Sequence, residues 1–295
     1  MTKRLLNIGG ILCVCAALFF FCNRQTQGFR YYSLLSDLPN DTRWEVDPLS
    51  QKQMEEIHAK LDQPFTFLNS GGWCYAFLGA DGKTILKFYN HEHLSLPHIF
   101  KHFSWPKLLF HSPRISPHER YFQEFNFTSC TLVYRHLKEL SGLLYVHLNK
   151  TEDLHKKVIL YDKIGVRHEI DLDRTEFVVQ ERAELLFDHL EQFHSRNDLS
   201  GAKRAINQLL ECLLTFSRQG IRDLDQKLYE NFGFVDNKAI ALDLSSFVFD
   251  PEIKRPAVYK KEILFKTQRL GRWIKKHYPE LLPHFDEQLN QLIER

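Results

Sequence analysis

Cysteine is scarce in this chain, and its distribution excludes two common frameworks. The 295 residues include six cysteines: three lie in one apolar segment near the N-terminus and three are widely spaced, namely Cys13, Cys15 and Cys22, then Cys74, Cys130 and Cys212. This spacing does not form a disulfide framework. The sequence also has no Cys-x-x-Cys pair and no His-Glu-x-x-His, so the usual spacings of zinc ligands are missing.

The sequence also lacks a strong charge of either sign and a catalytic-serine motif. The formal net charge is +2, which gives no electrostatic footprint for nucleic acid, so we expect no nucleic-acid partner. There is no Gly-x-Ser-x-Gly and no recognisable Cys/His pairing, so a nucleophilic hydrolase is not indicated. With 43% hydrophobic and 26% charged residues, the composition is that of a globular protein with one large core or two lobes.

What the sequence does contain is a series of acidic and amide side chains between Gly220 and Phe247. They lie along a predicted strand-loop-strand unit: Asp223, Asp225, Asn231 and Asp243. Mg²⁺ takes hard oxygen ligands, usually one or two carboxylates with phosphate oxygens, and phosphoryl transfer adds a carboxylate that orients the attacking hydroxyl. Three aspartates and one asparagine supply this chemistry, so the unit predicts a magnesium-nucleotide site.

In its order of elements, this region resembles the protein-kinase-like superfamily. A predicted apolar helix over Ala202–Arg218 ends just before Arg222-Asp223, which stands where the Arg-Asp of a catalytic loop would lie. Asn231 follows, and Asp243-Leu244-Ser245 occupies the position of the Asp-Phe-Gly turn. The resemblance implies ATP and Mg²⁺ as cofactors, with Asn231 and Asp243 as metal ligands.

A short hairpin connects these two motifs. Phe232–Val235 and Ala239–Leu242 read as strands, and Asp236-Asn237-Lys238 between them is turn chemistry and not a ligand. We expect Asp243 to be buried in an apolar strand, which would be costly without a partner or metal.

The pattern departs from the superfamily at three points. Ile221 replaces the histidine, Ser245 replaces the glycine, and Asn231 follows Asp223 by eight residues where about five are usual. The resemblance implies Asp223 as the catalytic base. Asp225 is the alternative base, or else a capping residue for the turn at Gln226-Lys227.

The N-terminal half contains further parts that the resemblance predicts. Leu68–Phe77 contains Gly71 and Gly72 and looks like a degenerate phosphate-covering loop, although a Gly-Gly pair is also common in ordinary hairpin turns. Thr84–Phe88 is an alternating strand whose Lys87 resembles the lysine of Val-Ala-Ile-Lys. The ordinary alternative for Lys87 is a solvated lysine on an edge strand.

A glutamate on the next helix should pair with Lys87. The helix is predicted from Pro117 to about Leu143, and Glu124 is the first candidate, with Glu119 as the second. Beyond it, strands are predicted at two places and a hinge at a third: Lys157–Tyr161, Glu176–Gln180 and Gln180–Ala183.

The first residues predict a signal anchor or a signal peptide. Lys3 and Arg4 precede Leu5–Cys22, in which only Asn7, Gly9 and Gly10 are not apolar. An uncleaved anchor would make the protein single-pass and membrane-bound through residues 5–22. The alternative is a secreted protein whose signal is cleaved.

Together these features predict an α+β, two-lobed protein-kinase-like fold with a reduced C-terminal lobe. The expected parts are a signal segment at 1–27, an extension at 28–60, an N-lobe at 61–182 with an insertion at 90–116, and a C-lobe at 183–295. Two helices, Val258–His277 and Leu281–Glu294, complete the C-lobe, and no Ala-Pro-Glu motif follows Asp243.

Without that segment, a platform for peptide substrates is not expected. The predicted activity is phosphate transfer from Mg-ATP to a small-molecule or sugar hydroxyl. The alternative is a non-catalytic, membrane-tethered or secreted pseudokinase that acts as a binding module for a protein partner.

Overall fold

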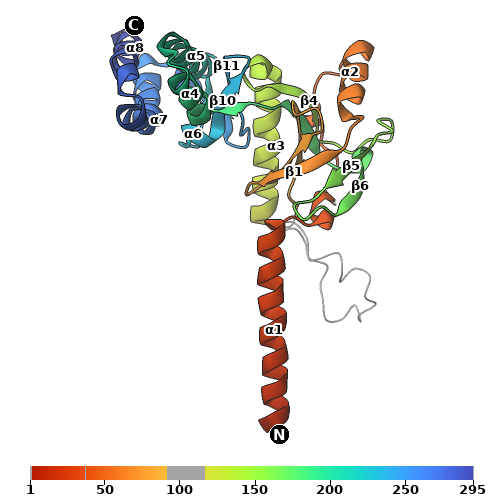
Figure 1. Cartoon of the computed structure of the whole chain (residues 1–295). Coiled ribbons are helices and arrows are strands. Elements are labelled where there is room, and N and C mark those ends of the chain that lie inside the picture. The colour runs from red at the N-terminus through yellow and green to blue at the C-terminus, as the bar shows by residue number, and fades with distance from the viewer. Residues whose placement is uncertain (1, 37, 92–116, 295) are drawn as a thin grey trace. The chain divides into compact units, whose positions relative to one another are not determined.

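The chain folds as a mixture of helices and strands (Figure 1). This computed structural model describes residues 2–36, 38–91 and 117–294. The chain divides into two compact units: unit 1 is Met1–Asp41, Leu49–Arg120 and His147–Val179, and unit 2 is Thr42–Pro48, Tyr121–Val146 and Gln180–Arg295. The predicted α+β class is confirmed. Tyr121–Val146 belongs to unit 2, whereas the sequence assigned it to the N-lobe.

The sheet begins with an antiparallel meander. Its strands are β1 (Phe65–Ser70), β2 (Cys74–Gly79) and β3 (Thr84–Tyr89). The chain turns between β2 and β3 at Gly82, which has a φ of 68°. Glycine adopts this left-handed conformation without the steric cost of a Cβ. The preceding Asp81 closes the turn, because its carboxylate accepts hydrogen bonds from the N–H groups of Lys83 and Thr84 at 2.8 and 2.9 Å.

Four more strands complete this sheet. They are β4 (Leu143–His147), β5 (Lys157–Tyr161), β6 (Arg167–Asp171) and β7 (Phe177–Glu181), and the strand order is β4-β7-β3-β2-β1-β5-β6. β5 pairs in parallel with β1 and antiparallel with β6. The prediction of β5 is confirmed at its exact bounds, β7 lies one residue later than predicted, and β4 and β6 were missed.

The core of unit 1 is largely aromatic. Its largest fully buried side chains include Phe65, Tyr75, Phe77, Phe88 and Phe177. Along β2 the buried positions alternate, as expected for a strand with one face toward a core. Helix α2 (Gln51–Leu61) is preceded by Ser50, whose side chain and that of Gln53 form a reciprocal capping box.

The predicted membrane anchor is wrong. The first residues form helix α1 (Thr2–Thr26), but among the described residues no helix has the length and apolarity needed to cross a bilayer. The apolar run Leu5–Cys22 has eighteen residues, which is near the lower limit for a span, and Asn7, Gly9 and Gly10 interrupt it. The finding contradicts the predicted single-pass localisation through residues 5–22.

Helices dominate the rest of the chain. They are α3 (Pro117–Leu137), α4 (Leu186–Ser195), α5 (Leu199–Arg218), α6 (Leu228–Asn231), α7 (Pro256–His277) and α8 (Leu282–Glu294). In α5 the buried residues Ala202, Ala205, Ile206, Leu209 and Leu213 recur at helical spacing, so the helix presents a continuous apolar face. The predictions of α5, α7 and α8 are confirmed with ends within three residues.

Helix α3 is shorter than predicted. It ends at Leu137, and a 3₁₀ turn follows over Lys138–Leu140. Gly142 then takes a φ of 61°, which ends the helical run before β4 begins at Leu143. Other 3₁₀ turns lie at Tyr31–Leu34, Thr42–Trp44, Leu172–Arg174, Pro251–Lys254 and Pro279–Leu281.

Unit 2 also contains two small sheets. Their strands are β8 (Glu184–Leu185), β9 (Ile221–Asp223), β10 (Phe232–Val235), β11 (Lys238–Ala241) and β12 (Phe247–Phe249), in the orders β11-β10-β8 and β12-β9. Gly233 allows β10 to approach β8, because a Cβ at this position would lie 2.3 Å from the Glu184 carbonyl oxygen. The predicted β10–β11 hairpin is confirmed, with β10 at its predicted bounds.

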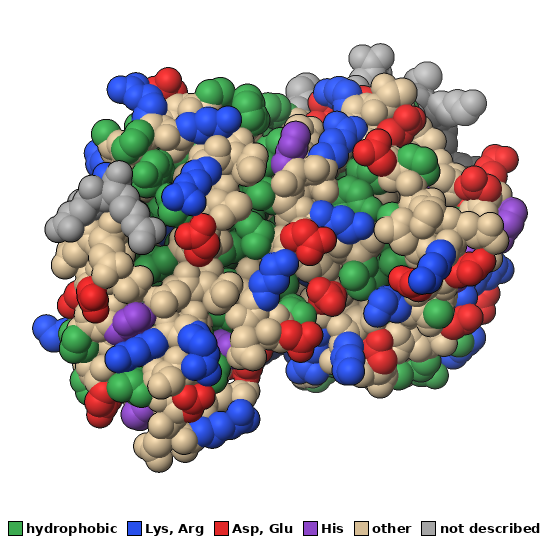
Figure 2. Space-filling model, turned by 90° about the horizontal axis from the view of Figure 1, so that it is seen from above, with side chains coloured by type: hydrophobic (Ala, Val, Ile, Leu, Met, Phe, Trp, Pro, Cys, Tyr) green, Lys and Arg blue, Asp and Glu red, His purple; other side chains and the backbone are tan. Residues whose placement is uncertain are grey.

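Charged side chains are mixed over the surface that Figure 2 shows. Lys and Arg alternate there with Asp and Glu, and no wide area of one sign is visible on this face. The formal net charge of +2 agrees with this mixture. The predicted insertion at 90–116 lies outside the described residues apart from Asn90 and His91.

Candidate functional site

The β10–β11 hairpin brings two of the predicted metal ligands to the same end. Phe232 pairs with Ala241, and one step further out the Leu242 N–H donates to the Asn231 carbonyl at 2.7 Å. Asn231 therefore enters the hairpin where Asp243 leaves it. At the opposite end, Asp236 and Asn237 form the turn with φ values of 47° and 64°, as their predicted turn role requires.

Asp243 is exposed, contrary to the expectation that it is buried in an apolar strand. Strand β11 ends at Ala241, one residue earlier than predicted, so Asp243 lies in the turn beyond it. Its Oδ1 accepts the Ser245 N–H at 3.0 Å. This bond orients the carboxylate while the side chain stays open to solvent.

Asp223 has the opposite environment. It ends strand β9, and its side chain is 6% exposed. Lys266 on α7 donates to its Oδ2 at 2.6 Å, and the Ser246 hydroxyl and the Asp225 N–H donate to its Oδ1 at 2.6 and 3.0 Å. Burial raises the pKa of Asp223, while the Lys266 charge and these three hydrogen bonds favour the carboxylate and oppose that rise.

Lys266 is a central residue of this region that sequence reasoning missed. Its side chain is 5% exposed, and its ammonium also donates to the Asp225 carbonyl at 2.8 Å. A lysine rarely occupies a buried position unless it is paired. The signal was present in the sequence, because Lys266 lies on the apolar stripe of α7 with Ile263, Leu270 and Ile274.

Asp225 takes the turn-capping geometry that was one of its two predicted roles. Its Oδ1 accepts the Lys227 N–H at 3.0 Å, which closes the turn at Gln226-Lys227. The residue is half-buried. The extra length of the loop is taken up by the short helix α6, which ends at Asn231.

Arg222, the residue before Asp223, also holds β9 in position through ion pairs. Its guanidinium lies 3.2 Å from Asp250 and 2.7 Å from Glu262 on α7. The hydrogen bond with Glu262 is the main reason that the pKa of Arg222 is raised, and Asp250 adds to it. Arg222 and Lys266 therefore tie the predicted catalytic loop to α7 through two separate ion pairs.

Ser129 of α3 holds the segment that follows Asp243. Its hydroxyl donates to the Leu244 carbonyl at 2.6 Å and accepts the Phe247 N–H at 2.7 Å. Ser129 is buried, so both bonds lie away from water. No motif or local pattern pointed to this residue.

In unit 1, the glycine pair lies in the turn before β2, and the strand lysine lies on β3, which pairs with β2. Gly71 and Gly72 are exposed in the β1–β2 turn, where the Gly71 N–H donates to the Cys74 carbonyl at 2.9 Å. Neither glycine has a positive φ, and a Cβ on Gly72 would meet no atom within 4 Å. Lys87 is half-buried in β3, opposite Ala76 of β2.

Glu124, the predicted partner of Lys87, lies on α3 in unit 2. Its side chain is 33% exposed, and its Oε2 lies 3.5 Å from Arg43. The pairing of Glu124 with Lys87 stays a prediction.

The donor types at the open end of the hairpin fit magnesium. Within the described residues, no group of three or more His, Cys, Asp or Glu side chains is arranged as a metal site. A Mg²⁺ bound with nucleotide does not need such a group, because phosphate oxygens and water fill most positions. The Asp243 carboxylate is exposed, and a carboxylate and an amide oxygen are ligand types that such an ion takes. The buried Nδ2 of Asn231 lacks a hydrogen-bond partner in the described part of the chain.

Comparison with known proteins finds similarity only among solved structures. No protein-family model matches the chain, and no curated protein does. The bifunctional kinase-methyltransferase WbdD is 14% identical, with 74% of this chain and 43% of WbdD covered and a TM-score of 0.36. A second WbdD structure is 15% identical, covers 76% and 45%, and has a TM-score of 0.37. The chain thus spans less than half the length of WbdD.

A further match covers nearly the whole of the other chain. APH(2")-IIa, in a ternary complex with streptomycin and ATP, is 11% identical, with 84% of this chain and 99% of that chain covered and a TM-score of 0.32. Because all these TM-scores are low, the functional assignment depends on the residues and topology of the chain itself.

Proposed function

We propose that this protein binds a magnesium nucleotide and transfers its terminal phosphoryl group to a hydroxyl of a small molecule or sugar. The observation that carries the proposal is the β10–β11 hairpin, whose register brings Asn231 and Asp243 to one end. The order of the other elements supports it: a glycine-bearing hairpin, a strand with Lys87, a helix with Glu124, and then an Arg-Asp loop.

Each residue has a defined role in this proposal. Asn231 and Asp243 hold Mg²⁺, which when bound neutralises charge on the phosphates. By the resemblance to kinase-like proteins, Lys87 is the candidate donor to phosphate oxygens, and Glu124 is its predicted partner. By the same resemblance, Gly71 and Gly72 are the candidates for the phosphate-covering turn, and both are exposed. A phosphate oxygen or a water would also supply the acceptor that Asn231 Nδ2 lacks.

The base for the acceptor hydroxyl is either Asp223 or Asp225. A base must come within about 3 Å of the proton that it accepts. Asp223 is buried and already accepts three hydrogen bonds, so it acts as the base only if Lys266 moves away. Asp225 is half-buried, and to act as the base it has to release only the Lys227 N–H of the turn that it caps.

Nucleotide binding is tested first, by calorimetry and by thermal shift with ATP or GTP, each with and without Mg²⁺. We expect a magnesium-dependent rise in melting temperature that Asp243→Asn removes, while the ligand-free melting temperature is unchanged because Asp243 is exposed. Asp236→Asn is the matched control, since it removes the same charge from the closed end of the same hairpin. If neither nucleotide at millimolar concentration shifts the wild-type protein, the nucleotide site is wrong.

A second candidate function is a binding module without catalysis. The observation in its favour is the buried ion pair of Asp223 with Lys266, which occupies the aspartate that the superfamily uses as a base. The two functions differ in turnover. ADP release with a panel of sugars and aminoglycosides, lost in Asp225→Asn or Asp223→Asn, would support transfer. Nucleotide binding without turnover, together with capture of a protein partner, would support the binding module.

A further inference from the structure

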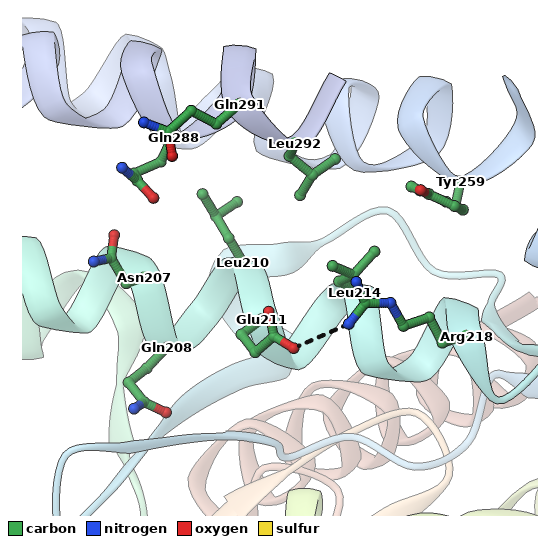
Figure 3. A pocket seen from close by; sticks show the side chains of 10 residues that line it. All are labelled: Asn207, Gln208, Leu210, Glu211, Leu214, Arg218, Tyr259, Gln288, Gln291 and Leu292. Atoms are coloured by element: carbon green, nitrogen blue, oxygen red, sulfur yellow. Dashed lines mark hydrogen bonds and ion pairs between the residues drawn. The ribbon is translucent and has the colours of Figure 1, made fainter. Parts of the chain in front are cut away.

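Unit 2 has a groove that the proposed phosphoryl transfer does not use. It lies between α5 and the pair α7 and α8, and its volume is about 270 Å³. Figure 3 shows its lining side chains: Asn207, Gln208, Leu210, Glu211, Leu214 and Arg218 from α5, Tyr259 from α7, and Gln288, Gln291 and Leu292 from α8. This volume lies just below the range of about 300–1,000 Å³ that is usual for small-molecule sites, so the groove suits only a small ligand, of one or two rings.

The polar lining is dominated by carboxamides. Four of the ten lining residues are Asn or Gln, and Figure 3 shows them gathered at one end of the groove. Two of them have a partner: Asn207 Oδ1 lies 2.8 Å from His284 Nε2, and Gln291 Nε2 donates to Glu287 at 3.2 Å. In the part of the chain that the structure describes, the side chains of Gln208 and Gln288 make no hydrogen bond. These amides are available to a ligand.

The groove carries no net formal charge. Among the described lining residues, the charged ones are Glu211 and Arg218, which lie 3.3 Å apart and neutralise each other. An anion would require uncompensated Arg or Lys, and a cation would require an uncompensated carboxylate. The chemistry of the lining therefore selects a neutral ligand.

The remaining lining is apolar. Leu210 and Leu214 are each 4% exposed and form the floor, and Leu292 and Tyr259 lie on the facing helices. A carboxamide presents donors and an acceptor together, which matches a hydroxyl group, itself a donor and an acceptor. A ligand with several hydroxyls and an apolar C–H face would satisfy both parts of this lining. That combination is the chemistry of a sugar ring.

A peptide fits the groove less well. An extended peptide is usually bound by the open edge of a sheet, and a helical peptide by a mainly apolar groove with anchors at helical spacing. This groove is formed by helices, whose backbone groups are satisfied internally, and only four of its ten lining residues are apolar or aromatic.

We propose that the groove between α5, α7 and α8 binds a neutral carbohydrate of one or two rings. The inference does not rest on the nucleotide site, because none of the lining residues belongs to the predicted metal or phosphate contacts. Gln208 and Gln288 donate to and accept from its hydroxyls, and Leu210 and Leu214 contact its C–H face.

The test uses the full chain with maltose, lactose, cellobiose and chitobiose as probes at millimolar concentration. Binding is followed by calorimetry and by the side-chain NH₂ signals of ¹⁵N-labelled Asn and Gln. At least one disaccharide should bind and shift the signals of Gln208 and Gln288. The double variant Gln208→Leu/Gln288→Leu should weaken binding about tenfold or more. Gln268→Leu, an exposed glutamine of α7 outside the groove, should change binding less than about twofold.

Two results would overturn the proposal. One is that none of the four disaccharides shifts the amide signals of Gln208 and Gln288. Binding of members of a peptide library in place of the disaccharides would count as this result. The other is that the double variant and Gln268→Leu bind a disaccharide equally well. Asp243→Asn separates the two proposals, since it should remove the magnesium-dependent nucleotide effect and leave disaccharide binding unchanged.

Discussion

Asp223 and Asp243 occupy opposite environments, although the kinase-like pattern treats them as partners in one site. Asp223 is 6% exposed and accepts three hydrogen bonds from protein groups. Asp243 is exposed, and one of its oxygens accepts a single backbone N–H. An aspartate whose oxygens already accept several protein hydrogen bonds, such as Asp223, has a structural role. An aspartate with free acceptor sites, such as Asp243, can bind a ligand.

Removing Lys266 should have the largest effect, because it leaves Asp223 as an unpaired buried carboxylate. We expect Lys266→Ala to lower the free energy of unfolding by about 3–5 kcal/mol, measured by denaturant titration. Lys261→Ala, on the exposed face of the same helix, is the matched control and should change it by less than about 0.5 kcal/mol. Equal midpoints for the two variants would mean that the Asp223–Lys266 pair has no structural role.

Lys87→Ala tests the proposed ligand-binding residues, in contrast to the structural pair Asp223–Lys266. Loss of a charge-assisted contact to phosphate should weaken Mg-ATP binding by about 1.5–3 kcal/mol, measured by calorimetry. Lys83→Ala in the exposed turn before β3 removes the same charge and should leave the affinity unchanged. An equal affinity in both variants would exclude Lys87 from the nucleotide site.

A second buried carboxylate, Glu176 in unit 1, extends the comparison to pH. Its side chain is 2% exposed, and it lies 3.1 Å from His91 and accepts the Ser36 hydroxyl at 2.6 Å. Burial raises the pKa of Glu176, but His91, Ser36 and Lys150 outweigh burial and hold the pKa below its usual 4.5.

The ionised form of Glu176 is therefore favoured by folding. Its contribution to stability is complete above pH 4.5 and is lost as the pH falls through the lower folded-state pKa. In urea titrations from pH 7 down to pH 3, Glu176→Gln should lose less stability on acidification than the wild type. Glu169→Gln, with 48% of its side chain exposed, should follow the wild type. Parallel curves for all three proteins would contradict this account.

Gly72→Ala should have the smallest effect on folding. A Cβ there meets no atom within 4 Å and the φ is not positive, so the free energy of unfolding should change by less than about 0.5 kcal/mol. If the β1–β2 turn covers the phosphates, the same substitution should still weaken Mg-ATP binding. Unchanged binding and unchanged stability together would favour an ordinary hairpin turn at Gly71-Gly72.

Sequence reasoning succeeded where the signal is local. The β10–β11 hairpin is specified by two short apolar runs around Asp236-Asn237, residues that tolerate the left-handed turn. The bounds of β5 and the extent of α5 follow in the same way from the period of their buried residues.

It failed where a neighbour distant in the sequence decides the environment. Asp223 is buried by Lys266, 43 residues further along the chain, and no local pattern predicts that pair. The exposure of Asp243 was also not predicted, because it depends on the path of the chain after β11 ends at Ala241. Sequence patterns locate strand ends less well than strands, since pairing of the backbone sets the ends.

The two hydrogen bonds of Ser129 also have a consequence for how the site forms during folding. They join α3 to residues 115 and 118 positions later in the chain, so they close a loop of more than a third of the protein. Contacts of such high sequence separation carry a large loop-closure entropy and slow folding. During synthesis, α3 emerges long before Leu244 and Phe247, so the Ser129 hydroxyl cannot form these two hydrogen bonds until those residues have been made. The turn after Asp243 thus acquires its shape only once the last quarter of the chain is being made.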